Sequence, residues 1–99
     1  MAHPLRIQRK RTKGHKLPEG AVYVGRPTKW GNPFHAKSEI FPTKSAEEAV
    51  MMFMETMRES PNFWDEVVRE LQGKRLACWC KLDQPCHADM LCKIANGEI

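Results

Sequence analysis

The stretch Ala77-Cys78-Trp79-Cys80-Lys81-Leu82-Asp83-Gln84-Pro85-Cys86-His87-Ala88-Asp89 decides the fold, because it joins an apolar segment to an amphipathic one through a short polar loop. The segment 75–80 is short and mostly apolar, which predicts a buried strand, although periodicity alone does not separate it from the start of a helix. Along 86–95 the apolar residues share one helical face, and Asn96-Gly97 follows, which predicts a helix that ends there.

Two further helices are predicted upstream of this stretch. Ser45 and Glu48 have the spacing of a capping box, and the apolar residues that follow recur at helical spacing, so we expect a helix over 46–58. Ser60-Pro61 combines an N-cap residue with a proline at the first helical position, which predicts a second helix that ends before Gly73.

The amino-terminal half favours strands. Residues 21–24 are β-branched and aromatic in character and form the clearest strand there, whereas 6–11 alternates weakly and is either a short edge strand or a disordered arm. Strands that alternate with helices favour a parallel sheet. We therefore predict a small, abbreviated Rossmann-like α/β domain, with a short, mainly parallel sheet flanked by about three helices.

Two loops are expected to meet in such a fold. The loops at 25–34 and 81–85 both leave predicted strands at their carboxyl ends, where parallel sheets bind ligands. Glycine, proline and asparagine exclude regular structure from 25–34, and its cations and aromatic residues suit a ligand site. A loop that simply buries Trp30 and Phe34 in the core is the alternative.

The charges are unevenly distributed. Lys and Arg number 16 and Asp and Glu 12, yet residues 1–16 hold six basic residues and no acidic one. This division predicts a basic amino-terminal arm or edge strand over 1–16 and a single α/β domain over 17–99. An arm of this kind contacts nucleic acid phosphates or is an ordinary solvated segment. Its candidate nucleic-acid residues are Arg6, Arg9, Lys10, Arg11, Lys13 and Lys16.

The sequence favours a cytoplasmic protein that does not bind membranes. It contains no apolar run long enough to span a bilayer and no apolar stretch typical of a secretory signal near its start. In a reducing compartment, its four cysteines are expected to be free thiols, metal ligands or catalytic groups, and disulfides are the weaker reading.

Several motifs resemble a family of short bacterial and phage proteins known as a domain of unknown function. They are V-Y-V-G-R at 22–26, W-G-N-P-F at 30–34, A-C-W-C at 77–80 and P-C-H-A-D at 85–89. The resemblance implies no particular activity. The Cys86-His87 pair is also similar to a motif of a larger Rossmann-like family, but Ala88 stands where that motif has arginine, so no anion contact is carried over.

Two kinds of site fit the cysteine-rich stretch. In the first, a small anionic or nucleotide-like ligand binds between the loops, and Cys86 at a helix amino end acts with His87 in catalysis. Its ligand-binding residues would be Gly25, Arg26, Lys29, Trp30, Asn32, Cys80 and Asp89. In the second, the protein is a zinc-binding accessory to nucleic acid, with Cys78, Cys80, Cys86 and His87 as ligands, although this spacing departs from the usual C-x2-C pairs.

A purely structural role is the third reading. Free cysteines are often small buried apolar residues, so Cys78 and Cys80 would then fill a central strand. His87 would cap the last helix and Trp79 would pack in the core. The three readings predict different environments for the same side chains.

Overall fold

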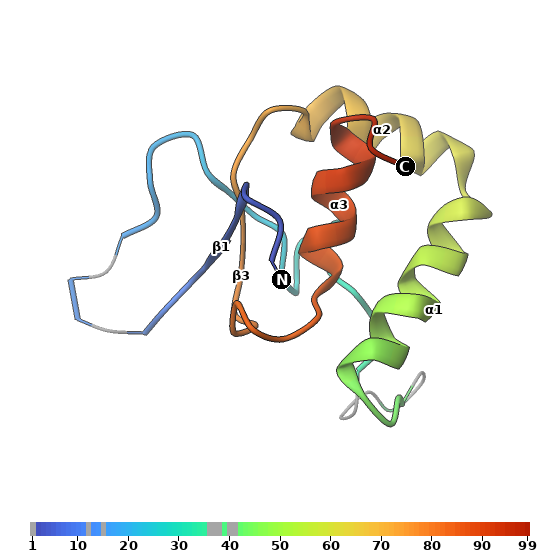
Figure 1. Cartoon of the computed structure of the whole chain (residues 1–99), viewed down its shortest axis with the longest axis horizontal. Coiled ribbons are helices and arrows are strands. Elements are labelled where there is room, and N and C mark those ends of the chain that lie inside the picture. Colours follow the sequence, from blue (N-terminus) through green and yellow to red (C-terminus); the bar gives the residue numbers. More distant parts are fainter. Residues whose placement is uncertain (1, 12, 15, 36–38, 40–41) are drawn as a thin grey trace.

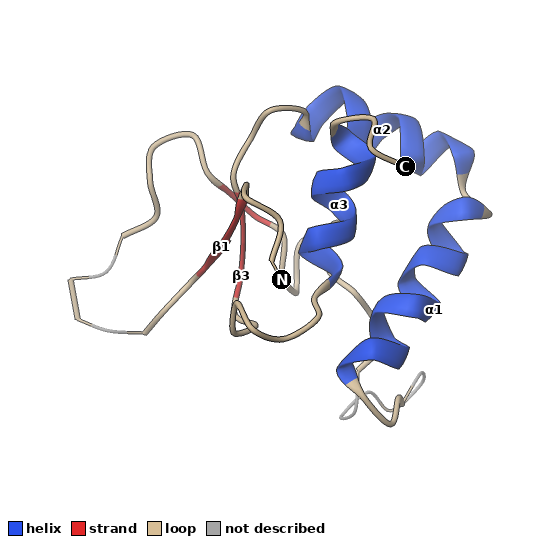
Figure 2. Cartoon of the chain, in the orientation of Figure 1, coloured by secondary structure: helices blue, strands red, loops and turns tan. Residues whose placement is uncertain are grey.

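The computed structural model describes residues 2–11, 13–14, 16–35, 39 and 42–99 of the chain. Figure 1 traces the chain and Figure 2 shows its helices and strands. The elements in chain order are β1 (Arg6–Gln8), β2 (Val22–Tyr23), α1 (Ala46–Arg58), α2 (Pro61–Leu71), β3 (Leu76–Cys78) and α3 (His87–Ala95).

The sheet has three short parallel strands in the order β1-β3-β2. Arg6 pairs with Leu76 on one side of β3, and Val22 pairs with the same residue on the other side. The central strand is fully buried, as expected for an apolar segment with a neighbour along each edge. The prediction of a small α/β domain with a parallel sheet and three helices is confirmed, and the edge-strand alternative holds for Arg6–Gln8.

Helix α3 lies between the sheet and the other two helices. It packs against β1 and β3 on one side and against α1 and α2 on the other. Its residues are therefore buried almost all round, with Leu91, Cys92 and Ile94 at most 1% exposed. Among the described residues, no helix is both long and apolar enough to cross a membrane.

The helix ends follow from local sequence. The Ser45 hydroxyl accepts a hydrogen bond from the Glu48 amide at 3.1 Å, so this half of the predicted capping box is formed at the start of α1. Beyond α2 the chain turns at Gly73, whose φ of +73° favours glycine. The Gly73 amide donates to the Asn96 side chain at 3.0 Å, which ties this turn to the end of α3.

A buried arginine joins the first strand to the last helix. The Arg6 side chain is 0% exposed, and its Nη1 donates to Asp89 Oδ2 at 2.6 Å. The same guanidinium donates to the backbone oxygens of Gln84 at 2.9 Å and Lys81 at 2.5 Å. Arg6 is therefore not placed to contact nucleic acid, because its buried guanidinium is paired with Asp89 and hydrogen-bonds the backbone of the 81–84 loop.

We expect Asp89→Asn to destabilise the fold strongly, by about 3 kcal/mol, because it leaves a buried guanidinium without its counter-charge. Glu66→Gln is the matched control, since it removes a carboxylate that pairs with the exposed Lys29 on the surface and should change stability little. Urea unfolding of both variants measures the difference. Equal stability of the two would contradict a structural role for the Arg6–Asp89 pair.

Candidate functional site

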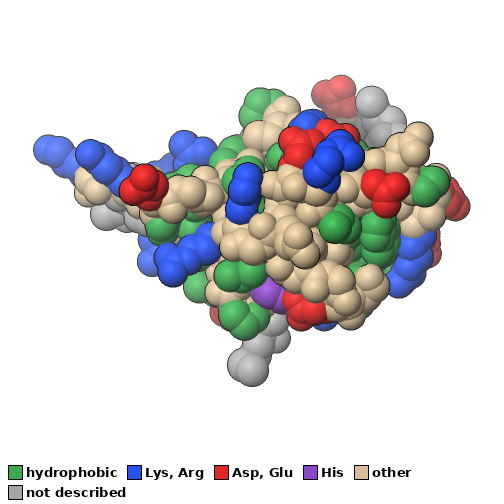
Figure 3. Space-filling model, turned by 90° about the horizontal axis from the view of Figure 1, so that it is seen from above, with side chains coloured by type: hydrophobic (Ala, Val, Ile, Leu, Met, Phe, Trp, Pro, Cys, Tyr) green, Lys and Arg blue, Asp and Glu red, His purple; other side chains and the backbone are tan. Residues whose placement is uncertain are grey.

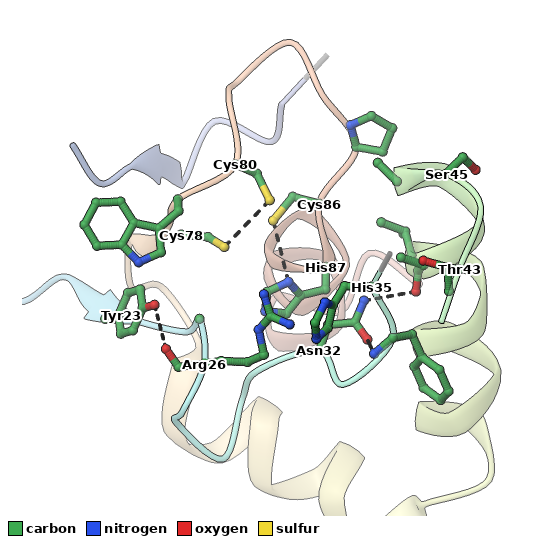
Figure 4. A pocket seen from close by; sticks show the side chains of 17 residues that line it. Tyr23, Arg26, Asn32, His35, Thr43, Ser45, Cys78, Cys80, Cys86 and His87 are labelled. Atoms are coloured by element: carbon green, nitrogen blue, oxygen red, sulfur yellow. Dashed lines mark hydrogen bonds between the residues drawn. The ribbon is translucent and has the colours of Figure 1, made fainter. Parts of the chain in front are cut away.

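A cavity of about 440 Å³ opens where the loops at 25–34 and 81–85 approach each other. Both loops contribute to its wall, as the strand directions led us to expect, and the start of α1 forms the remaining side (Figure 4). The lining residues are Tyr23, Gly25, Arg26, Asn32, Phe34, His35, Thr43, Ser45, Ala46, Ala49, Val50, Cys78, Trp79, Cys80, Pro85, Cys86 and His87.

Three thiols gather at one wall of this cavity. The sulfurs of Cys78, Cys80 and Cys86 all lie within 4.8 Å of one another, and the Cys78 and Cys80 sulfurs are 3.9 Å apart. Two thiolates on one tetrahedral zinc ion lie about 3.8 Å apart, given a Zn–S bond of about 2.3 Å. The three cysteines are thus close to a metal-binding arrangement, and such a group could hold a metal ion.

Local structure explains why the three sulfurs converge. Cys78 ends β3, and the chain bends directly after it, so that the Cys80 sulfur lies 3.9 Å from the Cys78 sulfur. Cys86 is the N-cap residue of α3, whose extended backbone brings its side chain back toward the end of the strand (Figure 4). One strand end and one helix start therefore supply the whole cluster.

The three neighbouring thiols shift one another's pKa in opposite directions. Hydrogen bonds from the Cys80 and Cys86 thiols lower the pKa of Cys78 well below the ordinary thiol value. The neighbouring Cys78 raises the pKa of both Cys80 and Cys86. The pKa of Cys86 is thus raised by its neighbour Cys78, although the sequence suggested that the helix amino end would lower it. A bound cation would remove the repulsion that keeps the second and third thiols protonated.

His87 lies beside the cluster but outside the three-sulfur group. Its Nε2 is 2.8 Å from the Val24 carbonyl, so Nε2 carries the proton and Nδ1 is left as an acceptor. Nδ1 lies 3.6 Å from the Cys86 sulfur. Burial lowers the pKa of His87, which favours the neutral ring. The imidazole thus contacts Cys86 while its other nitrogen anchors the ring to the end of β2.

Arg26 is the cation at the cavity, and it is exposed. The backbone near it is held by Tyr23, whose hydroxyl donates to the Arg26 carbonyl at 2.8 Å. Gly31 packs directly against Arg26, because a Cβ at this glycine would lie 2.9 Å from the Arg26 Cγ. The loop is therefore shaped around Arg26, which places a permanent positive charge at the cavity wall, near enough to add to the effect of burial in lowering the pKa of His87.

Asn32 lines the cavity, but its amide is used within the protein. Its Nδ2 donates to the Ala49 carbonyl at 3.0 Å, and its Oδ1 accepts from the Phe34 amide at 2.9 Å. Asn32 therefore fixes the 25–34 loop to α1. This differs from the expectation that the amide would bind a ligand, and the reason is that the loop's own backbone competes for it.

Three of the expected ligand residues do not line the cavity. Lys29 points to α2, where it pairs with Glu66 and Glu70. Trp30 is 5% exposed and packs against Phe63 with ring centroids 5.5 Å apart, as the core-filling alternative proposed. Asp89 pairs with Arg6 beneath the loop.

Sequence reasoning missed two aromatic residues and a histidine at the cavity. Tyr23 and Trp79 lie in its wall with centroids 6.4 Å apart, and His35 contributes from the other loop. Trp79 was expected in the core only as an alternative, yet it is 37% exposed. The available signal was its position between two cysteines that share a face, since alternation turns the intervening residue outward.

Comparison with known proteins places the chain in a family. The family described as "Domain of unknown function (DUF4326)" matches residues 7–97. The chain belongs to this family. The DUF4326 match runs from the second residue of β1 to just beyond α3 and so includes every residue of the thiol cluster. It confirms the expected membership of a domain-of-unknown-function family. No curated protein and no solved structure matches the chain.

The structure predicts two classes of thiol in protein freed of metal by a chelator. We expect Cys78 and Cys80 to be alkylated before Cys92, because both line the cavity and both are less deeply buried than Cys92. Cys92 lies in the core face of α3, where burial raises its pKa to about 12. Timed iodoacetamide labelling of the folded protein, followed by peptide mass spectrometry, measures the order. Alkylation of Cys92 at the rate of Cys78 and Cys80 would contradict the arrangement.

Proposed function

We propose that this protein binds a zinc ion through Cys78, Cys80 and Cys86 and uses the ion's remaining coordination position to bind a small anionic or nucleotide-like ligand in the adjoining cavity. The observation that carries the proposal is the convergence of three sulfurs within 4.8 Å at the wall of a 440 Å³ cavity. Cysteines that only fill the core are enclosed by other side chains, whereas these three line a cavity large enough for a ligand.

The donor set favours zinc. Thiolates are soft ligands that suit zinc, copper(I) and iron–sulfur clusters and bind magnesium or calcium poorly. Zinc is satisfied by tetrahedral geometry, and three protein ligands with one open position is the arrangement that zinc enzymes use to hold a water or a substrate. Iron–sulfur clusters commonly take four cysteines, and the fourth, Cys92, lies outside the three-sulfur group.

The surroundings of the cluster stabilise its charge. Three thiolates on Zn²⁺ carry a net charge of −1, and Cys86 stands at the amino end of α3, where backbone amides and the helix dipole favour negative charge. Cys78 raises the pKa of Cys80, and the positive charge of Arg6, held under the loop, opposes that rise. These positive contributions lower the cost of gathering three thiolates.

Arg26 supports an anionic ligand. It contributes a permanent positive charge to the cavity wall, which also includes the aromatic rings of Tyr23 and Trp79. A molecule with a planar base and a phosphate matches a cavity that pairs aromatic surfaces with one guanidinium, because the rings offer stacking and the guanidinium binds phosphate oxygens in a fork. The volume of the cavity lies in the usual range for ligand sites, about 300–1,000 Å³.

The test of the metal site is the zinc content of protein purified without chelator or histidine tag. We expect about one zinc per chain in the wild type and almost none in Cys86→Ala, because two thiolates hold zinc far more weakly than three. Cys92→Ala is the matched control: its side chain is as deeply buried, at 1% against 2% for Cys86, and it should keep its zinc.

Elemental analysis of both variants and the wild type measures this. Wild-type protein that neither contains zinc nor takes it up in a titration would overturn the metal site. Equal zinc in Cys86→Ala and the wild type would assign the metal to other residues.

The test of the open position uses protein substituted with cobalt(II), whose absorption bands respond to a change of ligand. We expect inorganic phosphate or one of the nucleoside 5′-monophosphates to shift these bands. Arg26→Gln should weaken that binding about tenfold, since it removes a charged hydrogen-bond donor from the cavity. Lys29→Gln is the control, because Lys29 is paired with α2 outside the cavity. An unchanged spectrum with every probe would contradict ligand binding at the metal while leaving the zinc site itself intact.

A further inference from the structure

A basic loop projects from the body of the protein between β1 and β2. In Figure 1 this segment extends to the left of the sheet, away from the three helices. Figure 3 shows Lys and Arg side chains along the same projection. From 9 to 20 the sequence contains five basic residues, Arg9, Lys10, Arg11, Lys13 and Lys16, and one acidic residue, Glu19. The projection therefore carries a concentrated positive charge on a narrow extension.

An aromatic pair stands at the base of this loop, in contact with two of its arginines. The Arg9 Cζ lies 4.8 Å from the Tyr23 ring centroid and 4.9 Å from the Trp79 centroid. The Arg11 Cζ lies 4.8 Å from the Trp79 centroid. Cation–π contacts engage the face of a guanidinium and leave its in-plane N–H groups directed outward, so the arginines keep their capacity to bind phosphate.

These cations are not neutralised within the described part of the chain. There, the ion pairs of lysine and arginine involve Arg6 with Asp89 and Lys29 with Glu66 and Glu70, and none involves Arg9 or Arg11. Trp79 is also 37% exposed, although tryptophan is a costly residue to leave in water. Unpaired guanidinium groups beside a half-exposed indole form a surface that is complementary to phosphates and to flat rings at once.

We propose that this surface, formed by the cations Arg9, Lys10, Arg11, Lys13 and Lys16 together with Tyr23 and Trp79, binds single-stranded nucleic acid. The loop cations contact the phosphates, and an unpaired base stacks on the Trp79–arginine assembly. Duplexes offer phosphates but keep the faces of their bases stacked inside. A run of acidic side chains offers negative charge but no flat rings that could stack on Trp79. A single strand is the partner that uses both features of the surface.

The location gives this surface a relation to the cavity. Tyr23 and Trp79 both belong to the cavity wall, so a strand held on the loop would pass the mouth of the cavity. The binding itself uses none of the three cysteines. It is therefore independent of the zinc site, and each proposal can fail without the other.

The experiment measures binding of fluorescently labelled oligonucleotides of about 12 residues by anisotropy, a length within the range that single-strand sites cover. The probes are a single-stranded DNA, an RNA of the same sequence and the corresponding DNA duplex. We expect the full-length protein to bind one of the single strands more tightly than the duplex. With about four phosphate contacts, affinity should fall about 50-fold between about 50 and about 200 mM salt.

Variants locate the surface. Arg9→Ala/Arg11→Ala and Trp79→Ala should each weaken binding about tenfold or more, whereas Trp79→Phe should retain most of it, because phenylalanine still stacks. The matched control is Arg58→Ala/Arg69→Ala, which removes two exposed arginines from α1 and α2, on the other side of the molecule (Figure 1). The circular dichroism spectrum and the urea-unfolding midpoint of every variant serve as a check that the fold is intact, whether or not the protein binds zinc.

Three results would overturn the proposal. One is the absence of oligonucleotide binding at 50 mM salt, a low ionic strength at which phosphate contacts are little screened. The second is an equal loss of affinity in the control double variant, which would assign binding to overall charge. The third is equal affinity for the duplex or for polyglutamate, which would show that the aromatic residues contribute nothing to the choice of partner.

Discussion

The buried ion pair between Arg6 and Asp89 is the interaction on which the rest of the structure depends. A guanidinium taken out of water is costly unless its charge is paired and its N–H groups find acceptors. Here the two terminal nitrogens of Arg6 bind a carboxylate on α3 and backbone oxygens of the 81–84 loop at the same time. The loop between β3 and α3 has no regular structure of its own, so this one side chain supplies contacts that a sheet or helix would otherwise provide. The position of Cys80 and Cys86 at either end of that loop follows from it.

The same ion pair keeps the carboxylate of Asp89 out of the cavity that Arg26 lines. Asp89 looked like a ligand residue because it stands on the first turn of the helix that begins beside Cys86. In the structure it faces away from the cavity and toward Arg6, so the cavity retains Arg26 as a cation and gains no carboxylate from this helix. An anion that enters the cavity would therefore meet thiols, rings and a guanidinium, without repulsion from Asp89.

Much of the fold was predictable from local signals. The N-cap residue and the apolar spacing predict the helix over Ala46–Arg58, and an apolar segment between turns predicts the central strand. What could not be predicted was the partner of each charged residue. From the sequence, Arg6 looks like one more cation in a basic arm, and Lys29 looks like a loop cation near a ligand. Only the tertiary structure brings Asp89 to Arg6 and Glu66 to Lys29.

The site was predictable to a similar extent. The sequence singled out the three cysteines, and the parallel direction of the strands indicated that the loops would meet. It did not show that His87 would be anchored by the Val24 carbonyl, or that Trp79 would be flanked by Arg9 and Arg11. Both facts depend on which strand lies beside which, information that residue spacing does not contain.

The strand order also determines when the protein can fold during its synthesis. The central strand, β3, is the last of the three to leave the ribosome, while β1 and β2 pair with it and not with each other. Until Leu76–Cys78 emerges, the two earlier strands have no partner, and contacts between such distant segments form slowly. The growing chain therefore exposes its basic loop before it possesses a sheet, and its four cysteines, at positions 78 to 92, emerge only after that loop and both outer strands.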